Sequence, residues 1–180
     1  MKRTISVLAA ALAMAVSTVG VWAAGGTTAT AYGAAAAQAA IKAGTTFTVT
    51  DMLRWAAEDE YLARAEYTAI IARFGAIRPY TNIMQAEEQH LSWLRTEYQN
   101  RKLAFPADGA AGHIVVPSDL RAAAQAGVDA EIGNIAMYEA FLARPEMAKA
   151  ENAAVKSLFE QLKRASENHL KAFKTQLAKY

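Results

Sequence analysis

Apolar residues recur at helical spacing in four long stretches of the chain. Between residues 50 and 74 the apolar positions fall three or four residues apart, and Gly75 ends the pattern. The same spacing returns in residues 79–101, in residues 128–143, and from residue 150 almost to the C-terminus. These stretches predict four amphipathic helices, and therefore an all-α domain.

The connections between these stretches differ greatly in length. A short turn through Arg78 and Pro79 joins the first two helices, which predicts antiparallel neighbours. Residues 102–117 have no helical period and contain prolines, glycines and His113, which is expected to be a surface-loop histidine. Fully extended, these residues span roughly 50 Å, whereas a helix of about 20 residues is ~30 Å long. The segment can therefore cross the length of a four-helix bundle between its second and third helices.

Three further local signals in the second half of the chain predict where helices begin, break and end. Ser118 or Asp119 is expected to cap a helical segment, because short polar side chains satisfy free N–H groups there. Gly127 is expected to break this segment into a short lead-in and the main third helix. Pro145 and the residues after it predict the last turn.

The N-terminal region has the pattern of an export signal. Lys2 and Arg3 precede an apolar run, and small residues follow up to Ala23, so residues 1–23 are expected to be a signal peptide cut after Ala23. Residues 24–47 are rich in Ala, Gly and Thr and predict a flexible spacer, with room for a short helix over residues 34–42. Residues 48–180 are then the folded domain.

The net charge and the absence of cysteine exclude some kinds of partner and of metal site. Cleavage would remove two of the 19 basic residues and none of the 17 acidic ones, so the mature chain would carry no net charge. A neutral chain argues against nucleic acid as a partner, since that partner selects a basic face. The chain has no cysteine, which excludes disulfides and thiolate metal sites. We expect a periplasmic or secreted protein, with no stable membrane insertion after cleavage.

Charged and polar residues interrupt the apolar faces of the predicted helices. Glu60 and Tyr67 lie on the buried stripe of the first helix, and Glu87 and His90 share one face of the second. A carboxylate and an imidazole in a core are costly unless something binds them. Glu-x-x-His is the pattern by which helix bundles present metal ligands, although a single copy is weak evidence.

An internal repeat strengthens the metal hypothesis. Glu60 to Tyr67 has the same Glu-x6-Tyr spacing as Glu131 to Tyr138, and Ala86–Leu91 matches Ala165–Leu170 at Ala, Glu, His and Leu. The two halves are therefore related as helix pairs. Pairing them about a pseudo-twofold axis brings five candidate ligands toward one point, with Tyr67 and Tyr138 around them: Glu60, Glu87, His90, Glu131 and His169.

The repeat, the long crossover and the paired ligands resemble the ferritin-like superfamily, which includes ferritins and rubrerythrins. The segments around Glu60, Ala86–Leu91 and residues 165–173 look most like the bacterial family called domain of unknown function 2202. The resemblance implies a ferritin-like antiparallel four-helix bundle that binds iron or manganese. It also implies oxidation of ferrous ion, or reduction of peroxide or oxygen. By resemblance, Glu60, Glu87 and His90 would serve one metal, and Glu131 and His169 the other.

The chain departs from that pattern at Ser166, which stands where the repeat calls for a second bridging carboxylate. With three carboxylates, a pair of divalent ions keeps one excess positive charge. The sequence therefore leaves open one ion or two, and whether the protein is an enzyme of the di-iron oxidoreductase type. A non-catalytic exported binding or structural module with a degenerate site is the alternative. A multi-subunit storage shell is a third reading, and a homodimer stays open.

Overall fold

The computed structural model describes residues 30–180, which are helical and contain no strand. The predicted signal peptide and its cleavage site lie outside these residues. No helix in the described part is long and apolar enough to span a membrane. The five α-helices are α1 (Gly33–Lys42), α2 (Val49–Phe74), α3 (Tyr80–Asn100), α4 (Leu120–Leu142) and α5 (Ala153–Leu177), and short 3₁₀ segments cover Ala110–Gly112, Pro145–Ala148 and Ala150–Asn152.

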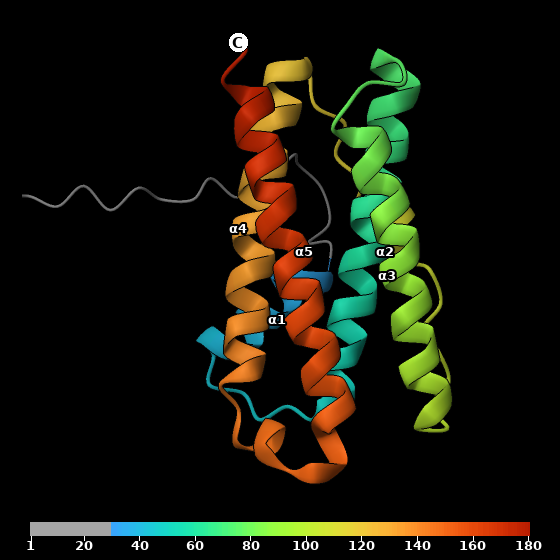
Figure 1. Ribbon diagram of the computed structural model, residues 1–180, viewed down its shortest axis with the longest axis vertical. Coiled ribbons are helices and arrows are strands. Elements are labelled where there is room, and N and C mark those ends of the chain that lie inside the picture. Colours follow the sequence, from blue (N-terminus) through green and yellow to red (C-terminus); the bar gives the residue numbers. More distant parts are fainter. Residues whose placement is uncertain (1–29) are drawn as a thin grey trace, which may run out of the picture.

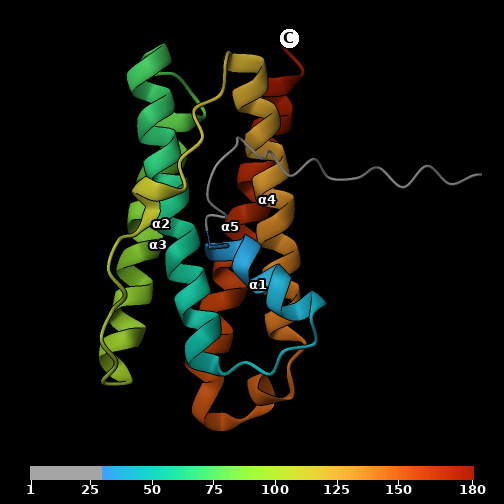
Figure 2. The ribbon, with the colours of Figure 1, turned by 180° about the vertical axis from the view of Figure 1, so that it is seen from behind.

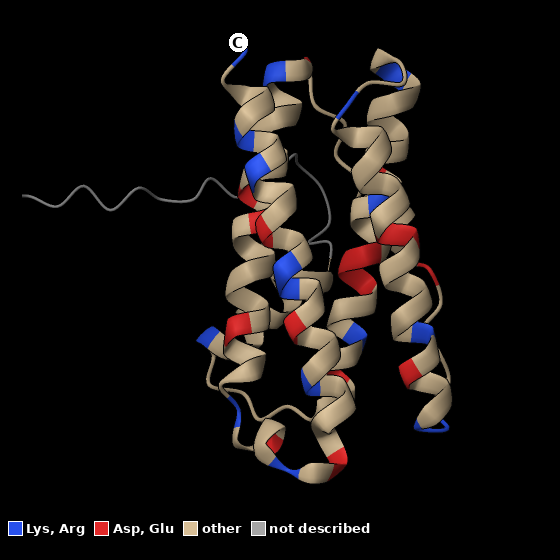
Figure 3. Ribbon diagram, viewed as in Figure 1, with Lys and Arg blue, Asp and Glu red and all other residues tan. Residues whose placement is uncertain are grey.

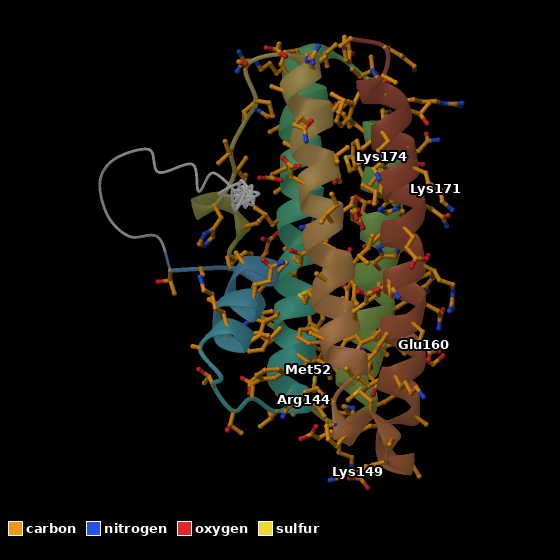
Figure 4. All side chains as sticks on the ribbon, turned by 90° about the vertical axis from the view of Figure 1, so that its left-hand side faces the viewer. Met52, Arg144, Lys149, Glu160, Lys171 and Lys174 are labelled. Carbon is orange, nitrogen blue, oxygen red and sulfur yellow. The ribbon has the colours of Figure 1, made fainter. Side chains whose placement is uncertain are left out.

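The four long helices form two antiparallel pairs, α2 with α3 and α4 with α5 (Figure 1). Side chains fix where α2 and α4 begin. Thr48 and Asp51 form a reciprocal capping box at α2, and the Asp119 carboxylate accepts a hydrogen bond from the N–H of Ala122 at α4. Each pair turns its apolar faces toward the other pair, while Glu160 and Lys171 lie on the outer side of α5 (Figure 4).

The segment between α3 and α4 runs along the outside of the α2–α3 pair from one end to the other (Figure 2). Its hydrogen bonds to other parts of the chain hold it in place. Tyr61 donates to the carbonyl of Pro106 at 3.3 Å, and Arg64 pairs with Asp108 at 2.7 Å. The ring of His113, which is half-buried, stacks on a tyrosine before α1 with centroids 4.4 Å apart.

Helix α1 lies within residues 24–47, the expected flexible spacer, but it packs against the long helices. It lies across α2 and α4 (Figure 2), and the N–H groups of Gly33 and Ala34 donate to the carboxylates of Glu58 and Asp59 at 3.2 and 3.0 Å. Gly33 has φ +57°, and a Cβ there would lie 2.9 Å from the Cα of Asp59. Only glycine fits this close approach. The short helix expected over residues 34–42 is thus docked by long-range contacts.

The expected break at Gly127 is wrong, since α4 runs without interruption through this residue. A Cβ on Gly127 would lie 2.7 Å from the ring of Phe173 on α5. The glycine therefore allows a close approach between α4 and α5 and does not end a helix. The helix expected from residue 150 begins at Ala153, because two 3₁₀ segments precede it.

Apolar side chains form two large clusters at opposite ends of the four long helices. The first cluster surrounds Trp55, Leu94, Phe141 and Phe159, and the second includes Tyr67, Tyr80, Ile83, Val128 and Phe173. Full burial of such side chains stabilises the fold by about 1.5–3 kcal/mol each. On every long helix, the predicted ligands fall between residues of the first cluster and residues of the second. These five buried or nearly buried residues lie between the two apolar clusters, and we call them the polar layer: Glu60, Glu87, His90, Glu131 and His169.

Candidate metal centre

The polar layer draws its side chains from all four long helices. Glu60 comes from α2, Glu87 and His90 from α3, Glu131 from α4 and His169 from α5. Figure 3 shows acidic stretches of α2 and α3 near the middle of these helices. The exposed fraction is 5% or less for the first four residues, and 11% for the side chain of His169. The structure therefore brings together all five residues that the repeat singled out.

The first of two clusters in this layer joins α2 to α3. The Nδ1 atom of His90 lies 3.0 Å from Oε2 of Glu60 and 2.7 Å from Oε2 of Glu87. Tyr138 on α4 donates a hydrogen bond of 3.1 Å to the other oxygen of Glu60. The helical spacing of Glu87 and His90 places both on one face of α3, so that they meet Glu60 together.

The second cluster joins α3 to α4 and α5. The Nδ1 atom of His169 lies 3.3 Å from Oε1 of Glu87 and 3.3 Å from Oε1 of Glu131. Glu87 therefore belongs to both clusters, with one carboxylate oxygen facing each histidine. Within each cluster, one ligand atom per residue lies within 4.8 Å of the others, and the two imidazole rings are 5.7 Å apart.

Burial and mutual contact shift the pKa values of these groups in opposite directions. Burial raises the pKa of Glu60 and of Glu131. It would also raise that of Glu87, but hydrogen bonds from His169 and His90 outweigh it and lower the pKa of Glu87. Burial lowers the pKa of both histidines, yet the surrounding carboxylates raise it overall, to about 10 for His90 and about 9 for His169. The carboxylates therefore favour the charged form of both imidazoles.

The two tyrosines expected around the ligands, and Ser166 at the position of the missing carboxylate, differ in their placement. Tyr138 is fully buried and bonded to Glu60, as described above. Tyr67 packs against the rings of Tyr80 and Phe173, with centroids 6.2 and 5.6 Å away. Ser166 is buried on α5, one turn before His169.

Two neighbours of the layer were not singled out from the sequence. Asp59 is 9% exposed because α1 covers it, and burial raises its pKa to about 7 although the N–H of Ala34 lowers it. No local pattern signals this contact, since its partner lies 25 residues away. Trp93 lies with its ring centroid 5.3 Å from that of His90. The sequence does indicate this contact, because Trp93 comes three residues after His90 and therefore lies on the same face of α3.

No protein-family model matches this chain, and neither a curated protein nor a solved structure shows a significant match to it. The chemistry of the polar layer therefore rests on its own residues and their geometry.

Proposed function

We propose that this chain is an exported ferritin-like protein that binds iron or manganese through the polar layer. The observation that carries the proposal is the shared carboxylate: Glu87 faces His90 with one oxygen and His169 with the other. Two three-residue clusters that meet in one buried glutamate are the arrangement that a carboxylate-bridged metal pair requires.

The donor set fits such ions. It consists of carboxylate oxygens and imidazole nitrogens, which suit iron and manganese, and it contains no sulfur ligand. One oxygen of Glu131, Oε2, is buried and has no hydrogen-bond partner. Leaving a buried charged oxygen unsatisfied costs about 1–3 kcal/mol or more. A cation bound to Oε2 of Glu131 would remove that cost.

Each residue has a definite role in the proposal. Glu60, Glu87 and His90 would hold one ion, while Glu131 and His169 would hold a second ion together with Glu87. Tyr138 orients Glu60 through its hydrogen bond, as outer groups commonly orient metal ligands. The two apolar clusters on either side keep bulk water away from the layer.

A bound iron pair would supply redox chemistry, in which each ion changes its charge by one, for oxidation of ferrous ion or reduction of peroxide or oxygen. The chain has no cysteine, so it cannot carry the thiolate electron-transfer module of rubrerythrins. A peroxidase cycle would therefore need an external reductant, whereas in ferrous oxidation the ferrous ion itself supplies the electrons. We assign the protein to this reaction class and leave the individual substrate to experiment.

The arrangement of the helices supports the ferritin-like part of the proposal. Two antiparallel helix pairs, joined by a segment that runs along the outside from one end to the other (Figure 2), are the arrangement expected of a four-helix bundle with one long crossover. The repeat relates these two pairs, and each contributes a buried histidine. Export is supported by the sequence of residues 1–23.

Metal content tests the proposal directly. We expect elemental mass spectrometry and anaerobic ferrous titration to give one or two ions per chain, with an increase in melting temperature. Glu60→Ala and His90→Ala should reduce the metal content. Unchanged metal content in both variants would refute this site. No binding and no thermal shift in the unmodified protein would instead favour the exported binding or structural module.

A further inference from the structure

We infer that the end of the bundle that holds the C-terminus is a docking surface for an anionic lipid bilayer. At this end lie the last turns of α2 and α5 and the first turns of α3 and α4 (Figure 1). The inference goes beyond the proposed function and does not depend on metal binding. Three observations support it: the distribution of charge along the bundle, the helix ends at which the cations lie, and the apolar side chains exposed beside them.

Charge is distributed unequally between the two sides of the polar layer. The side with the C-terminus has six basic side chains and one acidic side chain, in residues 67–86, 114–128 and 170–180. The other side has ten of each, in residues 30–59, 91–113 and 132–168. We call the first side the basic end (Figure 3), defined by six exposed cations: Arg73, Arg78, Arg121, Lys171, Lys174 and Lys179. The balanced charge of the expected mature chain thus hides a local excess of positive charge.

Within the described part of the chain, no Asp or Glu side chain forms an ion pair with any cation of the basic end. Arg73 donates a hydrogen bond to the carbonyl of Ser118 at 3.2 Å, and Arg121 donates one to the main-chain oxygen of Tyr180 at 2.9 Å. Lys171 lies on the outer side of α5 (Figure 4). The positive charge of this end is therefore available to a partner outside the chain.

Helix stability explains only part of this arrangement. A helix carries a partial negative charge at its C-terminus, so Arg73 in the last turn of α2 and Lys174 in the last turn of α5 stabilise their own helices. The same dipole disfavours cations at a helix N-terminus. Arg78 nevertheless comes directly before the N-cap Pro79 of α3, and Arg121 lies in the first turn of α4. These two arginines do not stabilise their helices, which favours a role toward an external partner.

Exposed apolar side chains accompany the cations. Val115 and Val116, in the segment that leads into α4, are 59% and 39% exposed, and Tyr180 is 47% exposed. The hydrogen bond from Arg73 to Ser118 holds this segment beside the end of α2. Cations next to exposed aliphatic and aromatic side chains are typical of proteins that bind at a membrane interface.

The spread of the cations favours a lipid surface over a single acidic peptide. They come from the ends of four different helices and carry long, flexible side chains, which suits a plane of many mobile phosphate headgroups. The contact would be peripheral, since none of the described helices is able to span a membrane. The long axis of the bundle would then stand away from the bilayer, with the polar layer outside it.

Vesicle sedimentation tests the inference on the full chain. The protein should bind vesicles of phosphatidylglycerol and phosphatidylcholine in equal parts, but not vesicles of phosphatidylcholine alone, and sodium chloride should release it by screening the charges. Arg78→Gln combined with Lys174→Gln should weaken binding by roughly tenfold, since each cation near an anionic surface contributes about fivefold in affinity. Lys149→Gln combined with Lys156→Gln removes the same charge from exposed positions at the opposite end and should leave binding unchanged.

Fluorescent labels identify the end that touches the bilayer. Because the chain has no cysteine, Ala76→Cys and Ala148→Cys each create a single labelling site. Both positions are exposed, Ala76 in the turn between α2 and α3 and Ala148 at the opposite end of the bundle. An environment-sensitive label at position 76 should shift to the blue when phosphatidylglycerol vesicles are added, whereas a label at position 148 should not respond.

Several outcomes would overturn the inference. These are no binding to phosphatidylglycerol vesicles, equal binding to phosphatidylcholine vesicles, equal losses in the two double variants, or equal responses of the two labels. Binding of soluble polyglutamate without binding of vesicles, lost in the variant of Arg78 and Lys174, would also overturn it and assign the basic end to an acidic protein partner. Metal content should be the same in both double variants, so the proposed function stands or fails separately.

Discussion

Glu87 on α3 and His169 on α5 lie 3.3 Å apart, and this contact crosses from one helix pair to the other. The second oxygen of Glu87 lies 2.7 Å from His90 on its own helix. One side chain therefore couples two clusters that would otherwise be separate. Glu131, in contrast, contacts His169 alone among the histidines.

This difference predicts unequal effects of removing each carboxylate. Glu87→Gln should abolish binding of both ions, because it removes a ligand from each cluster. Glu131→Gln should remove only the second ion and leave the cluster of Glu60, Glu87 and His90 intact. Bound metal per chain, counted by elemental analysis, is the measurement. Glu88→Gln, an exposed neighbour on the same helix, serves as the control and should retain full metal content.

Trp93 should report metal binding through its fluorescence. Its ring lies 5.3 Å from that of His90, and 37% of the residue is exposed. A paramagnetic ion bound at His90 should quench this indole strongly. In Trp93→Phe most of the quenching should disappear while metal content stays the same. Equal quenching in Trp93→Phe and Trp55→Phe would show that the ion binds away from His90.

Two glycines of α4 should respond oppositely to the same substitution. Gly127→Ala would place a Cβ 2.7 Å from the Phe173 ring. Overpacking of this kind costs about 1–3 kcal/mol, which should outweigh the helix propensity that alanine gains and lower the melting temperature. At Gly133 the nearest atom is the side-chain nitrogen of Gln38 at 3.2 Å, at the end of a flexible side chain. Gly133→Ala should therefore raise stability by up to about 1 kcal/mol. Thermal unfolding of the two variants measures both effects.

Glu66 should make stability depend on pH. Burial raises its pKa to about 7, although the N–H of Val115 lowers it. Because this value exceeds the ordinary one of 4.5, the contribution of Glu66 to stability is fully present below pH 4.5 and is lost as the pH rises through 7. Glu66→Gln should therefore raise the melting temperature at pH 8 and change it little at pH 4.5. The exposed Glu151→Gln should show no such difference between the two pH values.

Periodicity predicted the long helices well because helix ends carry local signals. The expected ranges 50–74 and 79–101 differ by one residue at most from the ends of α2 and α3. Gly75 and the turn at Pro79 set these limits within the sequence itself. The repeat was equally informative for the polar layer, since Glu131 would not have been chosen without its counterpart Glu60.

Tertiary contacts account for what the sequence did not predict. Glycine weakens an isolated helix, so the sequence predicts a break at Gly127, whereas the role of this residue depends on Phe173, which lies 46 positions later in the chain. The docking of α1 depends in the same way on Glu58 and Asp59. Local propensity carries no information about such partners. The metal, the substrate and the export route remain predictions.

The position of the polar layer between the two apolar clusters has a consequence for cooperativity. Each cluster joins residues of all four long helices, so each end can hold together while the other opens. Hydrogen exchange of the metal-free protein should then resolve two blocks of amides with different opening free energies, divided at the level of Glu60 and Glu131. Ions that bridge the layer would link these blocks, and the loaded protein should exchange as a single unit.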